Sequence, residues 1–160
     1  MLSAAAITSC GVTSQQAVEY NDKIIHEQTI VYNKELALME AMKNYKDMEG
    51  MKKAQDELIN SSKSSIQVIK NLDKFDGSTE FADAAIIFLE TYKGFAEKEY
   101  NELIELYSLP QEDYTEEKEN RANELFDIIE KAVDTSIQKF GLAQDAFATK
   151  YKIELVDKDV

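Results

Sequence analysis

The chain has 160 residues, a net charge of −13 and a single arginine, Arg121. This length suggests one domain, and an apolar content of 44% is too high for a disordered chain. The acidic balance argues against nucleic acid as a partner, because phosphate groups repel a negative surface. One proline and five glycines favour long helices.

The only cysteine, Cys10, lies at the start of the chain and follows Ile7, Thr8 and Ser9. This stretch resembles a bacterial lipobox, and the resemblance implies that Cys10 carries at least a diacylglyceryl group and anchors the protein to a membrane. The sequence departs from the pattern in one respect. Only nine residues precede Cys10 and none is Lys or Arg, whereas a signal peptide has a basic start and a longer apolar segment. We therefore expect residues 1–12 to be the remainder of a signal and lipobox segment with a short tether, either because the true start lies upstream or because the given sequence begins inside the signal. The alternative is a frayed N-terminus with an incidental cysteine.

The first predicted helix covers residues 13–46. Thr13 and Gln16 have the spacing of a capping box. Apolar residues then recur every seven positions in two adjacent rows, which is typical of a helix-bundle seam. The first row is Ala17, Ile24, Val31, Leu38 and Tyr45, and the second is Val18, Ile25, Tyr32 and Met39.

Two further helices are predicted over residues 51–72 and 79–107. Gly50 marks the turn before the first of them, and Asp76-Gly77 with Ser78 as N-cap marks the start of the second. Phenylalanines spaced by seven line the second helix at positions 81, 88 and 95. Pro110 ends it, because proline cannot continue a helix.

The last predicted helix covers residues 115–151, after a cap at Asp113, and leaves residues 156–160 as a tail. Short links between long helices favour antiparallel neighbours. The sequence therefore predicts an all-α domain over residues 13–155, folded as an antiparallel up-down-up-down four-helix bundle with long helices.

Several polar residues fall on the apolar faces of these helices and are the candidate functional residues. They are Asn21, Gln28 and Glu35 in the first helix, Glu99 in the third, and Ser136 and Gln144 in the fourth. Buried polar groups need partners, so those on facing helices are expected to meet. One interpretation is a structural hydrogen-bond ladder that fixes the pairing of the helices. The other is a polar cavity for a small ligand, with hydroxyls from Tyr32, Tyr92 and Tyr100 and raised pKa values at Glu35 and Glu99.

Three stretches of the chain resemble a family of small all-helical bacterial surface lipoproteins whose biochemical role is uncharacterised. They are VEYNDKIIHEQ, FADAAIIFLETYKGFAEKEY and AFATKYKIEL. The resemblance implies a lipid-anchored helical domain on the cell envelope, at the outer membrane or cell surface, and it carries no catalytic residues.

The sequence contains no recognisable catalytic constellation or cofactor motif, and its one histidine is too few for a di-iron bundle site. We therefore expect no enzyme activity, no metal and no cofactor. The predicted function is a non-enzymatic binding or interaction module, held at the membrane through Cys10, with an unknown protein or small-molecule partner. A small-molecule carrier is the first alternative, and an enzyme of unknown chemistry is the second.

Overall fold

A computed structural model describes residues 11–43 and 47–155. Helix α1 spans Ser14–Lys43, and the predicted continuation to residue 46 lies outside the described residues. Helix α2 spans Met48–Lys70 and begins three residues earlier than predicted. The reason is local, since the Asp47 side chain accepts a hydrogen bond from the Gly50 amide at 2.9 Å and caps the first turn.

Helix α3 spans Glu80–Glu97 and follows a tight turn in which Phe75 and Ser78 exchange backbone hydrogen bonds. Asp76 and Gly77 both adopt positive φ, at 51° and 77°. A glycine is needed at the second of these positions, because the left-handed region is strained for residues with a Cβ. The predicted Asp76-Gly77 turn is thus present, although Thr79 rather than Ser78 is the residue that precedes the helix.

The predicted third helix is broken at Lys98, so that α4 spans Glu99–Tyr107 as a separate element. Lys98 has φ −126° and ψ −74°, outside the helical range. The side-chain amide of Gln55 in α2 donates a hydrogen bond of 2.7 Å to the backbone carbonyl of Ala96. In an unbroken helix this carbonyl accepts a hydrogen bond from the backbone N–H of Tyr100. A side chain inserted into the backbone ladder is a known cause of helix breaks.

A short 3-10 helix, Gln111–Asp113, follows Pro110 and leads into α5, which spans Glu116–Tyr151. Thr115 is extended and precedes the first turn. At the other end Lys152 adopts the left-handed conformation, and the Ile153 amide bonds back to the Ala148 carbonyl at 3.0 Å. This wrapped C-terminal turn is a Schellman-type cap.

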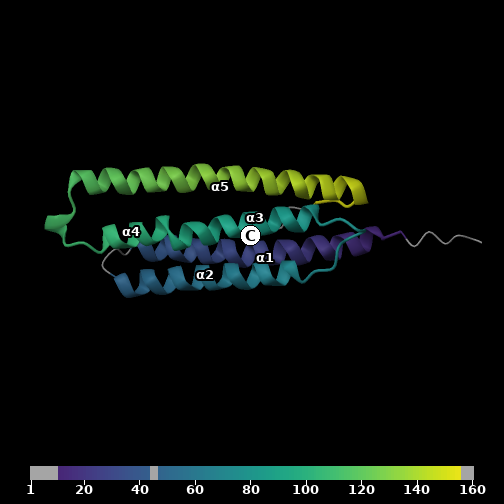
Figure 1. Ribbon diagram of the computed structural model, residues 1–160, viewed down its shortest axis with the longest axis horizontal. Coiled ribbons are helices and arrows are strands. Elements are labelled where there is room, and N and C mark those ends of the chain that lie inside the picture. Colours follow the sequence, from purple (N-terminus) through teal and green to yellow (C-terminus); the bar gives the residue numbers. More distant parts are fainter. Residues whose placement is uncertain (1–10, 44–46, 156–160) are drawn as a thin grey trace, which may run out of the picture.

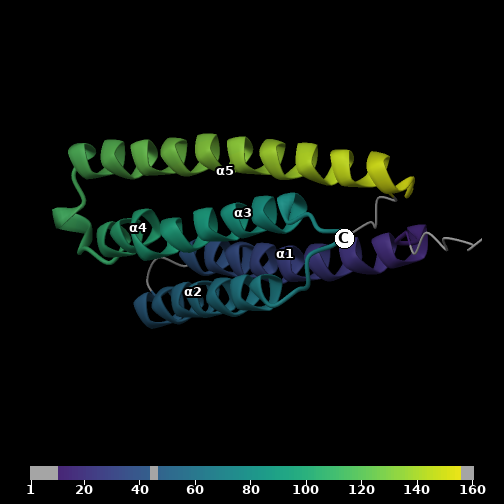
Figure 2. The same cartoon turned by 45° about the vertical axis from the view of Figure 1, so that its right-hand side comes forward.

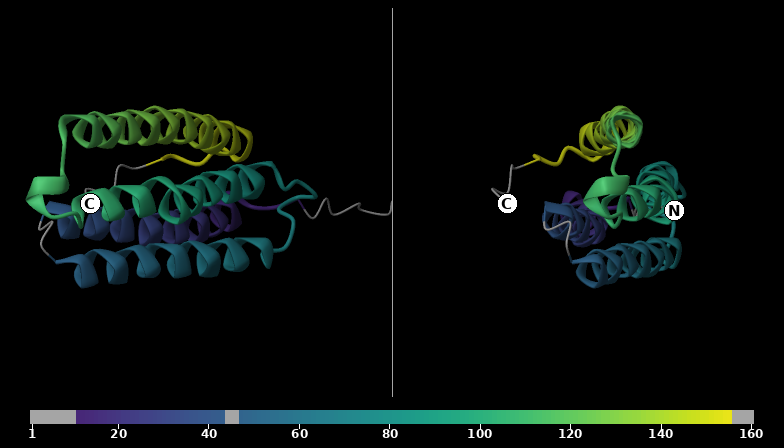
Figure 3. Two further views of the ribbon diagram at one scale, coloured as in Figure 1. Left: turned by 60° about the vertical axis from the view of Figure 1, so that its left-hand side comes forward. Right: turned by 90° about the vertical axis from the view of Figure 1, so that its left-hand side faces the viewer.

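The helices form an all-α antiparallel bundle in which α4 continues in the direction of α3 (Figures 1 and 2). Helix α2 packs on both α1 and α3, whereas α5 packs mainly on α3 and only lightly on α1. The end-on view shows α5 on one side of α1 and α3, with α2 on the other (Figure 3). The predicted fold class is therefore confirmed.

The two apolar rows of α1 have different environments. Ala17, Ile24, Val31 and Leu38 of the first row are buried, and its last member, Tyr45, lies outside the described residues. In the second row Tyr32 is 37% exposed and Met39 is 42% exposed. The first row is therefore the core seam, and the second lies on the side of α1 that the other helices cover incompletely.

The end of the bundle where α1 begins is closed by a cluster of aromatic rings. Phe147 of α5 lies at its centre, with ring centroids 4.8–5.7 Å from those of four neighbours. These neighbours are Tyr20, Phe75, Phe81 and Tyr151. Because they come from α1, the α2–α3 turn, α3 and the end of α5, the cluster ties both ends of the described chain together.

Membrane crossing is not supported by any helix among the described residues, since none combines the length and the apolar character of a spanning segment.

Two glycines lie inside helices with open space beside them, Gly94 in α3 and Gly141 in α5. Alanine at either position restricts the unfolded chain and favours the helix, so each substitution should raise the free energy of unfolding by about 0.5–1 kcal/mol. Gly77→Ala should lower it, because the φ of +77° is strained for alanine. Urea denaturation of the three variants measures the two expected gains and the one expected loss in the free energy of unfolding. A loss of stability in Gly141→Ala would contradict the prediction.

Candidate functional site

The polar residues predicted to lie on the inner face of α1 are largely withdrawn from solvent. Asn21 is 8% exposed and Glu35 is 6% exposed, while Gln28 is half-buried. Glu99 and Ser136 are each 8% exposed, and Gln144 is half-buried. The helical periodicity therefore placed four of these six side chains in the core.

Glu35 lies against two tyrosines that come from α3 and α4. The Tyr100 hydroxyl donates a hydrogen bond of 2.9 Å to Glu35 Oε1, and the Tyr92 hydroxyl also interacts with this carboxylate. Burial raises the pKa of Glu35 above its usual value, and the two hydroxyls offset part of that effect. Burial and the adjacent carboxylate both raise the pKa values of Tyr92 and Tyr100.

The other predicted polar residues form separate contacts instead of one ladder. Gln144 of α5 donates a hydrogen bond of 2.9 Å to Asn21 of α1, which is one of the few direct links between these helices. Ser136 bonds to the Val133 carbonyl of its own helix at 2.9 Å. Glu99 pairs at 3.1 Å with Lys98, whose side chain is 81% exposed, so Glu99 does not join Glu35.

Burial favours the protonated form of Glu35, whereas the hydroxyl donors favour its carboxylate. The hydrogen bond from Tyr100 joins α1 to α4, so the arrangement can fix helix pairing. Among the described residues there is no group of three or more His, Cys, Asp or Glu side chains that could hold a metal ion. Cys10, the predicted lipidation site, lies outside the described residues.

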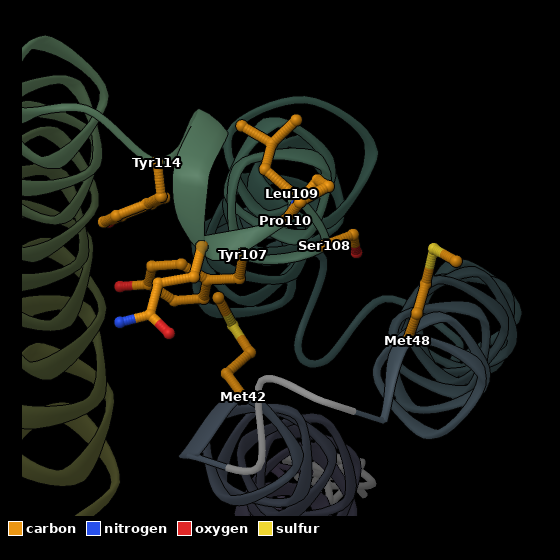
Figure 4. A pocket seen from close by; sticks show the side chains of 8 residues that line it. Met42, Met48, Tyr107, Ser108, Leu109, Pro110 and Tyr114 are labelled. Atoms are coloured by element: carbon orange, nitrogen blue, oxygen red, sulfur yellow. The ribbon is translucent and has the colours of Figure 1, made fainter.

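A pocket of about 800 Å³ opens at the end of the bundle opposite the aromatic cluster (Figure 4). It lies between the end of α1, the start of α2 and the segment that joins α4 to α5. In the close-up, Met42 points toward Tyr107, and Met48 stands on α2 across from them. The lining is Met42, Met48, Tyr107, Ser108, Leu109, Pro110, Gln111 and Tyr114.

A groove of about 500 Å³ runs along the side of the bundle between α3 and α5, and we call it the α3–α5 groove. Its most exposed apolar side chains are Ile87, at 62%, and Ile128, at 46%. Ser136, one of the predicted polar residues, also lines it. The complete lining is Ala84, Ile87, Phe88, Thr91, Ile128, Lys131, Ala132, Thr135, Ser136 and Lys139.

Apart from Ser136, the residues of the α3–α5 groove are not among those predicted from the sequence to be functional. A signal was nevertheless present, because both exposed isoleucines belong to doublets, Ile86-Ile87 and Ile128-Ile129. Neighbouring residues in a helix point about 100° apart, so one member of each doublet lies off the core face. Ile129 is indeed 5% exposed, while Ile128 next to it is 46% exposed.

The chain matches no protein-family model, no curated protein and no solved structure.

Proposed function

We propose that this protein is a non-enzymatic interaction module, held on a bacterial cell envelope at the outer membrane or cell surface by lipid attached to Cys10. The observation that carries the interaction role is the α3–α5 groove, in which Ile87 and Ile128 are open to solvent on neighbouring helices. Contiguous exposed apolar side chains on a protein surface mark sites of interaction with other proteins, membranes or ligands.

The position of α1 supports the tether. The helix begins at Ser14, four positions after Cys10 in the sequence, at the end of the bundle that holds the aromatic cluster. An anchor on Cys10 would hold that end near the membrane. The helices extend about 45–54 Å from there at 1.5 Å per residue, so the α3–α5 groove would face the space beside the membrane.

A small-molecule carrier is the competing function, and it requires a cavity bordered by Glu35 or Glu99. The four pockets described along the chain have other linings. The carboxylate of Glu35 is instead occupied by tyrosine hydroxyls. These contacts favour the interaction module over the carrier.

The intact mass of the protein recovered from the membrane fraction of its native host tests the tether. We expect a mature polypeptide that begins at Cys10 and carries the added mass of at least two acyl chains. One acyl chain alone gives only weak membrane binding. A Cys10→Ser variant expressed from the same locus should lose the added mass and move to the soluble fraction. An unmodified wild-type chain in the soluble fraction would refute the lipid anchor.

A further inference from the structure

We propose that the α3–α5 groove receives an amphipathic helix of a partner protein whose apolar face is bordered on one edge by Asp or Glu. The inference rests on the proposed interaction role but not on the lipid at Cys10. Recognition of a helix in a groove between two helices uses apolar anchors spaced by three, four and seven residues.

The floor and walls of the groove suit such a helix. Ala84 and Ala132 are small and allow another helix to approach closely, while Phe88 forms part of the buried base. Ile87 and Ile128 project from the two walls and would pack between the anchors of the incoming helix. An open groove of this kind suits an elongated apolar surface better than a small molecule, which needs to be enclosed.

The charges on the α5 side of the groove specify the acidic edge. The charged side chains in the lining are Lys131 and Lys139, and no carboxylate is among the lining residues. Neither lysine forms an ion pair with a described residue, whereas Glu90 on the neighbouring side of α3 is already paired with Lys93. In a chain of net charge −13, the charged side chains that line this groove are therefore both positive.

The spacing of the two lysines also sets the spacing of the acidic groups. Lys131 and Lys139 are eight residues apart on one helix, a rise of about 12 Å. Two carboxylates seven residues apart on a partner helix span about 10.5 Å on one edge and would face both lysines.

Binding of designed helical peptides to the full-length chain tests the proposal. One peptide carries a leucine face with two glutamates seven residues apart on one edge, and its control carries lysines at those two positions. We expect the glutamate peptide to bind about tenfold more tightly in fluorescence anisotropy. Its amide shift perturbations in NMR spectra should map to the α3–α5 groove.

Three variants make the outcome specific. Ile87→Ser should weaken binding of the glutamate peptide about tenfold, because it removes an apolar anchor while leaving the buried core intact. The double variant Lys131→Glu with Lys139→Glu should reverse the preference between the two peptides. Val68→Ser is the matched control, since Val68 is 45% exposed on α2, which does not line the groove, and binding should be unchanged.

Equal affinity of the wild type for the two peptides would overturn the proposal. So would an Ile87→Ser variant that binds the glutamate peptide as tightly as the wild type does. A dimer of the free protein in sedimentation that Ile87→Ser dissociates would also overturn it, because a second copy would then occupy the groove. The result for the groove is independent of the lipid anchor. A lipidated chain that fails to bind the glutamate peptide refutes only the groove, and an unmodified chain that binds it refutes only the tether.

Discussion

Replacing Phe147 by alanine should lower the free energy of unfolding by about 3–5 kcal/mol, the usual cost of removing a buried aromatic ring. Its ring contacts those of Tyr20, Phe75, Phe81 and Tyr151, so the substitution opens a space that four different segments line. Because these rings belong to separate elements, the space cannot be closed by a small shift of any one of them.

Denaturant titration monitored by circular dichroism measures this loss. Leu142→Ala is the matched control, because Leu142 lies on the same helix and is 63% exposed. We expect its effect to stay within about 0.5 kcal/mol, as is usual for surface positions. A Phe147→Ala variant no less stable than Leu142→Ala would show that the aromatic cluster does not hold α5 in place.

Replacing Tyr100 by phenylalanine should lower the free energy of unfolding by about 1.5–3 kcal/mol at pH 7, the range for a hydrogen bond to a charged group. The substitution removes the hydroxyl that donates to Glu35 and leaves this carboxylate buried with one donor fewer. At pH 4 the loss should be smaller, because a protonated Glu35 makes only a neutral hydrogen bond, worth about 0.5–1.5 kcal/mol.

The raised pKa of Glu35 determines the direction in which its contribution to stability changes with pH. The folded protein holds the proton more tightly than the unfolded chain, whose value is about 4.5. The stabilising contribution of the proton is therefore fully present below pH 4.5 and is lost as the pH rises through the folded-state pKa. The Glu35→Gln side chain cannot titrate. The stability of this variant relative to the wild type should therefore increase as the pH rises from 4.5 through the folded-state pKa of Glu35.

A double-mutant cycle of Tyr100→Phe and Glu35→Gln, measured by denaturation at pH 4 and pH 7, isolates the contact. The coupling free energy between the two positions should be larger at pH 7. A coupling that is independent of pH would mean that Glu35 does not change its protonation state in this interval. A coupling measured without added ligand would also show that Glu35 stabilises the fold through Tyr100, as the structural interpretation requires.

The seven-residue spacing of apolar residues was sufficient to predict the fold class, because helix periodicity is a local property of the chain. The same phase placed Asn21, Glu35 and Glu99 in the core, and all three are at most 8% exposed. The break at Lys98 could not be predicted in this way. It depends on Gln55, which lies 41 residues before the carbonyl it engages and belongs to another helix.

Helix periodicity also could not predict which apolar residues remain exposed in the folded bundle. A repeat shows which face of a helix is apolar, but not whether a neighbouring helix covers that face completely. Met39 of the second row on α1 is 42% exposed, and α5 packs mainly on α3 and only lightly on α1. The α3–α5 groove follows from the same packing, and its residues became visible as a site only with the helices in place.

The light packing of α5 on α1 also bears on the order in which the bundle assembles. Helices α1, α2 and α3 are joined by short links and contact their neighbours in sequence, so these contacts close small loops and can form early. The contacts between α1 and α5 join residues more than 120 positions apart, as in the pairs Asn21–Gln144 and Ser14–Tyr151. Closing so large a loop costs more chain entropy, and the docking of α5 on α1 is therefore the step that raises the contact order of an otherwise local topology.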